Sequence, residues 1–170
     1  REIGTNRLTS RALDVVDYDN DNIDELFLGT SQSLGGYFAV YDVATDTIEW
    51  QSPLTGRSES PVAMTHADVN GDSYRDLIGL TNTGYIYVYD VHAQSLVWKS
   101  SALGGSGIDI QAADLDGDGE SEIVALTSFG IVVCGESTVG APFVERARRS
   151  VTDIVDVLVS DLDGDGESEI

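Results

Sequence analysis

Residues 114–123 read Asp-Leu-Asp-Gly-Asp-Gly-Glu-Ser-Glu-Ile, and residues 161–170 repeat this stretch unchanged. Looser copies occupy residues 17–26 and 68–77. Every copy has an oxygen-bearing side chain at positions 1, 3 and 5, an acid at position 9 and an aliphatic residue at position 10. We number these four stretches as acidic loops 1 to 4 in chain order.

The spacing of the oxygen atoms predicts a site for a hard cation. Calcium accepts about 6–8 oxygen ligands from carboxylates, carbonyls and water in a flexible geometry. Position 7 would add its backbone carbonyl, from Ile23, Tyr74, Glu120 and Glu167. The candidate side-chain ligands at positions 1, 3, 5 and 9 are Asp17, Asp19, Asp21 and Glu25; Asp68, Asn70, Asp72 and Asp76; Asp114, Asp116, Asp118 and Glu122; and Asp161, Asp163, Asp165 and Glu169.

Two other interpretations of the loops compete with this one. Asp, Asn and Gly are ordinary turn residues, so a single copy could be a solvated turn; four copies in one phase argue against that. An EF-hand loop also begins with alternating acids, but it needs a Glu at position 12. Position 12 here is Leu28, Gly79 or Ala125, and the flanking segments are β-rich.

The loops begin at residues 17, 68, 114 and 161, which indicates a repeat of about 50 residues. In each repeat an apolar run enters the loop, a short apolar strand leaves it, and two further strands follow after a Gly-containing turn. We predict four strands per repeat, no helix, and one domain over 1–170 with repeats at 12–60, 62–107, 108–152 and, incomplete, 154–170.

The net charge of -21 excludes some partners. Half of the 30 acidic residues occupy the loop positions above, so much of the acidity belongs to the predicted cation sites. The 9 basic residues form no stripe that could meet phosphates, which argues against nucleic acid and anionic membrane surfaces. No apolar run approaches the ~18 residues of a membrane span.

The sequence predicts the surroundings of several single residues outside the loops. Cys134 lies in an apolar run and should be a buried, inert thiol. His66 should pack in a strand near loop 2, and His92 should be solvated in a turn. The third repeat departs from the pattern at 143–149, where three arginines indicate either a solvated strand with local salt bridges or a docking patch for an acidic neighbour.

The loops resemble the FG-GAP/VCBS-type repeat, a family that includes the calcium-bearing blades of integrin α-subunit propellers. The resemblance covers nearly the whole chain and implies a β-propeller whose calcium loops join the first and second strand of each blade. It carries the ligand roles onto the residues given above. Asn22 replaces Gly at position 6 of loop 1, and Asn tolerates the left-handed backbone. Asn70 and Ser73 make loop 2 the weakest match.

A second resemblance concerns Asp42-x-x-Thr45-Asp46-x-x-x-Trp50, which is similar to the tryptophan docking motif of quinoprotein-type propellers. The copy from Asp90 to Trp98 lacks the Thr and Gly of that motif. We expect both tryptophans to pack between blades, which does not require a quinone cofactor.

The sequence shows no nucleophile signature and no phosphate-binding Gly loop. We therefore expect a non-catalytic, calcium-stabilised propeller that acts outside the cytoplasm, at the cell surface or in the periplasm, as a scaffold, adhesion or interaction module. Its partners would be a protein or glycan ligand, or neighbouring subunits of a larger assembly. The alternative is the non-catalytic part of a secreted carbohydrate-active enzyme or quinoprotein-type oxidoreductase. Propellers close with about 4–8 blades, so three repeats and the start of a fourth predict a fragment.

Overall fold

The computed structural model describes residues 7–32, 34–136, 143–163 and 168–170. Over these residues the fold is all-β, with three four-stranded antiparallel sheets and no helix. A membrane-spanning helix is likewise absent from this part of the chain. The expected four strands per repeat are confirmed for the first three repeats.

Each sheet is a simple meander in which consecutive strands pair. Sheet A contains β1 (Arg7–Val16), β2 (Glu25–Gln32), β3 (Gly35–Asp42) and β4 (Thr47–Gln51). Sheet B contains β5 (Pro61–Ala67), β6 (Asp76–Thr81), β7 (Ile86–Asp90) and β8 (Ser95–Lys99). Sheet C contains β9 (Gly107–Ala113), β10 (Glu122–Thr127), β11 (Gly130–Glu136) and β12 (Phe143–Arg149).

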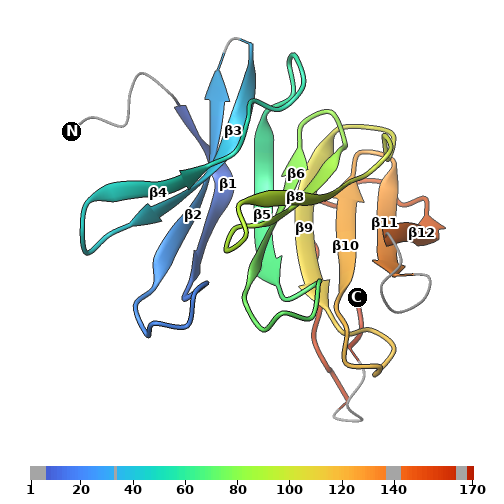
Figure 1. Ribbon diagram of the computed structural model, residues 1–170. Helices are drawn as coiled ribbons and strands as arrows, with labels where there is room; N and C mark the ends of the chain where they lie inside the picture. The colour runs from blue at the N-terminus through green and yellow to red at the C-terminus, as the bar shows by residue number, and fades with distance from the viewer. Residues whose placement is uncertain (1–6, 33, 137–142, 164–167) are drawn as a thin grey trace.

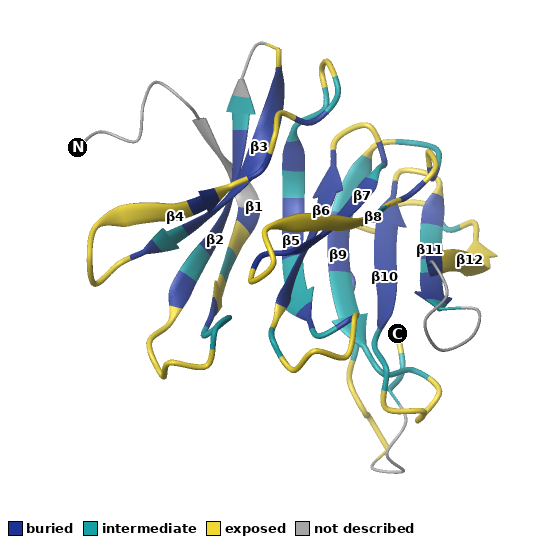
Figure 2. Cartoon of the chain, viewed as in Figure 1, coloured by how far each residue is buried: buried dark blue, intermediate teal, exposed yellow. Residues whose placement is uncertain are grey.

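The three sheets stand side by side and face one another (Figure 1). Their first strands are neighbours, since β1 packs beside β5 and β5 beside β9. The second strands are covered on both faces, and every residue of β6 and β10 is buried. The fourth strands are mostly exposed (Figure 2). This gradient explains why the second strands are apolar in sequence without alternation.

Alternate residues of a second strand face two different cores, one on each side of its sheet. Leu77 of β6 joins Phe27 and Phe38 between sheets A and B, whereas Ile78 joins Ile123 of sheet C between sheets B and C. A Cβ on residue 79 would lie 2.0 Å from the Phe38 ring, so only glycine leaves room for this aromatic side chain. The apolar composition of these strands is thus tied to contact with the neighbouring sheets.

The two tryptophans make equivalent contacts between neighbouring sheets. Trp50 of β4 lies 5.1 Å from the ring of Tyr89 in sheet B, and Trp98 of β8 lies 5.4 Å from the ring of Phe143 in sheet C. The expectation that both pack between successive sheets is confirmed.

The third repeat keeps the fold of the first two despite its different sequence. The pairing of third and fourth strands shifts register after Val40, after Val88 and, in sheet C, after Val133. The arginine-rich segment is the fourth strand, β12, as in the first of the two interpretations offered for it. Arg148 forms a local salt bridge with Glu145, whereas Arg146 pairs with Asp116 of loop 3.

Two segments depart from the regular strand pattern. Arg7–Ser10 is the first part of β1, which pairs with β2 and shifts register between Leu8 and Leu13. The apolar run 154–160 precedes loop 4, as the first strand of each sheet precedes its own loop. Ser160, at the end of this run, forms an isolated antiparallel bridge with Glu169. Val157 nevertheless packs on Val124 and Leu126 of β10.

Candidate metal centres

Loops 1, 2 and 3 each join the first strand of a sheet to the second, as the family resemblance implies. They lie at the same end of the three sheets, at the bottom of Figure 1. Positions 4 and 6 adopt a left-handed backbone in all three, with φ between 65° and 90°. The residues there are Asn20 and Asn22, Gly71 and Ser73, and Gly117 and Gly119. This backbone curls each loop around its own acids.

The carboxylate at position 1 organises each loop by accepting backbone N–H groups. In loop 3, Asp114 accepts from Gly117 at 2.7 Å and from Gly119 at 2.8 Å. These hydrogen bonds lower the pKa of Asp114, because they stabilise its charged form. Asp68 accepts from the same two positions in loop 2, whereas Asp17 in loop 1 accepts from positions 5 and 6. Hydrogen bonds within the protein therefore hold the loops in shape without a bound cation.

The acid at position 9 closes each loop by accepting the backbone N–H of position 2. The donor is Val69 for Asp76, Leu115 for Glu122 and Leu162 for Glu169, at 2.9 to 3.0 Å. In loop 1, Tyr18 donates to Glu25. From the sequence we assigned position 9 only as a ligand and missed this structural role, although the strict spacing of eight residues from position 1 was its signal.

Three loops bring their acids together as the ligand assignment requires. In loops 1, 3 and 4 the acids at positions 1, 3 and 9 each place one oxygen atom within 4.8 Å of the others. These clusters are Asp17, Asp19 and Glu25; Asp114, Asp116 and Glu122; and Asp161, Asp163 and Glu169. Asp165 and Glu167 of loop 4 lie outside the described residues. Each cluster is a set of oxygen donors that could hold a cation.

Loop 1 has the donor set that most needs a cation. Glu25 is 4% exposed, and its Oε2 atom is buried without a hydrogen-bond partner. Burial raises the pKa of Glu25 to about 7. An unpartnered buried carboxylate oxygen is costly, and a bound cation would remove this cost. The residues of loop 1 therefore fit calcium.

Loop 2 differs in its donors, as its sequence indicated. Asn70 occupies position 3, and its amide nitrogen donates to Asp90 of β7 at 3.3 Å. Burial raises the pKa of Asp76, at position 9, to about 7. Among the described residues, loop 2 forms no three-acid cluster of the kind found in the other loops. No signal in the sequence marked the role of Asp90.

Loop 3 already contains a positive charge. Arg146 of β12 donates from Nη1 to Asp116 at 2.8 Å and to Glu122 at 2.7 Å. Both acceptors are predicted calcium ligands. The unusual run of three arginines in an acidic chain marked this segment, but its contact with loop 3 could not be read from the sequence.

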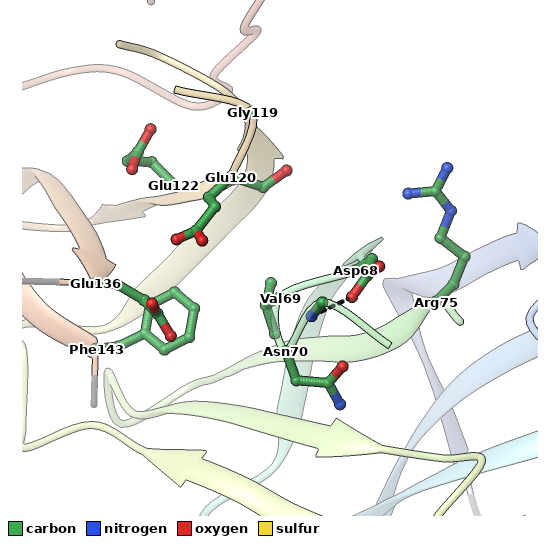
Figure 3. Close-up of a pocket in the computed structure, with 11 residues that line it drawn as sticks. Asp68, Val69, Asn70, Arg75, Gly119, Glu120, Glu122, Glu136 and Phe143 are labelled. Atoms are coloured by element: carbon green, nitrogen blue, oxygen red, sulfur yellow. Dashed lines mark hydrogen bonds between the residues drawn. The ribbon is translucent and has the colours of Figure 1, made fainter. Parts of the chain in front are cut away.

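Neighbouring loops also meet one another. The amide of Asn20 in loop 1 donates to the carbonyl of Ser73 in loop 2 at 3.1 Å, and the N–H of Arg75 donates to the carbonyl of Tyr18 at 3.3 Å. Between loops 2 and 3 lies a cleft of about 430 Å³. Glu120, Glu122 and Glu136 stand on one side of it, opposite loop 2 (Figure 3).

The two histidines and the cysteine singled out in the sequence lie outside the acidic clusters. His66 Nδ1 lies 2.8 Å from Asp14 Oδ2 and so joins sheet B to sheet A. His92 is exposed in its turn and stacks on Tyr74 at 3.8 Å. Cys134 is buried, as expected, and burial raises its pKa to about 12.

The fold and loops define a class of protein: repeated four-stranded antiparallel sheets, each with an acidic loop between its first and second strands. Residues 68–125 match the family model described as an FG-GAP-like repeat. This segment runs from loop 2 into β10 and includes loop 3, so the chain carries an FG-GAP-type repeat here, as the sequence resemblance implied.

Other comparisons concern the fold alone. No curated protein matches the chain significantly. A similar fold occurs in a solved structure described as "Crystal structure of an active polycomb repressive complex 2 in the basal state", with a TM-score of 0.51 and 14% sequence identity. The match covers 76% of this chain and 30% of that one. The chain thus spans less than a third of the length of that neighbour.

Proposed function

We propose that this chain is part of a calcium-stabilised β-propeller that acts outside the cytoplasm as a non-catalytic scaffold, adhesion or interaction module. The three sheets would be successive blades, and the loops would hold calcium at one end of the propeller. The buried, unpartnered oxygen of Glu25 is the observation that carries the calcium assignment. Calcium would supply the positive charge that this carboxylate lacks.

The location follows from the affinity expected of such loops. Extracellular calcium modules bind at ~10⁻⁴–10⁻³ M. Sites of this affinity would fill outside a cell and stay mostly empty in cytosol. The hydrogen bonds made by the acids at positions 1 and 9 support the assignment of the loops as calcium sites, because they hold each loop in shape while calcium binds.

The partner that we propose is a protein or glycan ligand, or neighbouring subunits of a larger assembly. The net charge of -21 disfavours nucleic acid. Bound calcium would reduce this charge and rigidify the loop end of the sheets, which is the end that holds the cleft between loops 2 and 3.

Calorimetric unfolding of the chain in EDTA and in calcium tests the proposal. With calcium at ~100 times Kd, a filled site adds ~2.7 kcal/mol, which for this size raises Tm by roughly 5–10 °C. Asp19→Asn should reduce this rise and remove one calcium ion from the titration stoichiometry. Asp24→Asn is the matched control, since it removes the same charge from position 8 without removing a ligand.

An unchanged Tm in EDTA and in calcium would overturn the calcium assignment. A loss of calcium binding that is equal for Asp19→Asn and Asp24→Asn would show that the acids act only through their total charge. Discovery of catalytic activity or a bound quinone seated on these sheets would overturn the non-catalytic assignment.

A further inference from the structure

We propose that Arg146 is a built-in cation for loop 3, which competes with calcium for Asp116 and Glu122. This inference rests on the proposed calcium function and adds a ranking to it. Loop 1 would depend on calcium for its charge balance, whereas loop 3 would keep its acids compensated at low calcium. Calcium could fill loop 3 only by displacing the guanidinium group from both acids.

The contacts of Arg146 place its charge inside the ligand cluster. Nη1 reaches Asp116 Oδ2 at 2.8 Å and Glu122 Oε1 at 2.7 Å, while Nε donates to the carbonyl of Glu136 at 3.0 Å. A planar guanidinium with five donors can serve these acceptors together. The side chain of Glu122 is 3% exposed, so this is a largely dehydrated carboxylate.

Loops 1 and 3 differ in the partner of one carboxylate oxygen, the second oxygen of the glutamate at position 9. In both, one oxygen of the position-9 glutamate accepts the N–H of position 2. The other oxygen is unpartnered in Glu25 and paired with Arg146 in Glu122. The same ligand position therefore lacks a positive partner in one loop and has one in the other.

The path of Arg146 to the loop depends on Gly135 of β11, the strand between β12 and β10. A Cβ on residue 135 would lie 2.7 Å from Arg146 Nε and 2.9 Å from Glu122 Oε1. A larger residue at this position would block the side chain. Glycine thus leaves the space through which Arg146 crosses to its acceptors.

Site-resolved NMR titration of the chain with calcium chloride tests the competition. The amides of Gly117 and Gly119 report on loop 3, and those of Asn22 and Ile23 report on loop 1. For Arg146→Gln we expect the Kd of loop 3 to fall about tenfold, which corresponds to ~1.4 kcal/mol, with loop 1 unchanged. Arg148→Gln is the matched control, because Arg148 lies on the same strand but pairs with Glu145.

Unfolding in EDTA provides the second measurement. Arg146→Gln should lower the unfolding midpoint there, because Glu122 loses its counter-charge, and saturating calcium should remove the deficit relative to wild type. An unchanged or higher Kd of loop 3 in Arg146→Gln, or an equal fall in Arg148→Gln, would overturn the inference while loop 1 still binds calcium. If the amide signals of loop 1 did not shift on adding calcium to the wild type, that result would instead overturn the proposed function and this inference with it.

Discussion

At the scale of single residues, the loops show how a backbone requirement appears in sequence. Positions 4 and 6 need a positive φ, and loop 3 meets this need with glycine at both. Loop 1 uses Asn20 and Asn22, which adopt the left-handed region more readily than most residues. Ser73 is the exception, with a φ of 73°. Loop 2 therefore carries local strain that loops 1 and 3 avoid.

Ser73→Gly should relieve this strain. We expect the free energy of unfolding in EDTA to rise by about 0.5–1 kcal/mol, the left-handed cost of a non-glycine residue less the entropy that glycine adds to the unfolded chain. Urea denaturation measures the change. Ser121→Gly, at position 8 of loop 3 and without a positive φ, should lower stability instead. A rise of equal size in both variants would contradict this account.

At the scale of strands and loops, the sequence predicts what repeats and misses what does not. The four strands of each repeat follow from alternating turns and apolar runs, and the loops follow from regular spacing of acids. Contacts unique to one repeat could not be predicted, because they depend on how two sheets or two strands meet. Arg146 reaching loop 3, Asp90 holding Asn70 and Gly79 making room for Phe38 are of this kind.

Asp109 of β9 gives one such contact a measurable pH dependence. It is buried beside the carboxyl of Asp156, and it accepts the N–H of Val157 at 3.2 Å. Burial first, and then the hydrogen bond with Asp156, raise the pKa of Asp109 above its ordinary 3.8. The folded protein therefore binds this proton more tightly than the unfolded chain, so stability falls as pH rises from 3.8 through the raised folded pKa.

Asp109→Asn should remove that loss while keeping an acceptor for Val157. We expect a higher unfolding midpoint than wild type at pH 7 in EDTA, with the difference shrinking as the pH approaches 3.8. Asp156→Asn should act in the same way, and the double variant should gain less than the sum of the two. A gain that is constant across pH would show that the raised pKa of Asp109 is not its cause.

At the scale of the whole molecule, repulsion among the many negative charges opposes the packing of the sheets. The chain has 30 acidic and 9 basic residues, and the described loops place many of the acids at one end of three neighbouring sheets. Contacts between loops 1 and 2, together with the packing of Trp50 and Trp98 onto the next sheet, hold the sheets together. Self-repulsion among the acids should destabilise the metal-free chain.

Comparing salts separates general screening from specific binding. Sodium chloride shortens the Debye length from about 30 Å at 0.01 M to about 3 Å at 1 M, so it should raise the unfolding midpoint of the EDTA-treated chain gradually. Calcium at a few millimolar should raise the midpoint further than sodium chloride of equal ionic strength. The reason is that calcium would bind the paired acids of each loop and contact the buried oxygen of Glu25, which screening in solvent cannot reach. Magnesium, which prefers strict octahedral geometry and retains its waters, should fall between them. Equal midpoints for calcium and sodium chloride at matched ionic strength would mean that the loops act only as a diffuse negative surface.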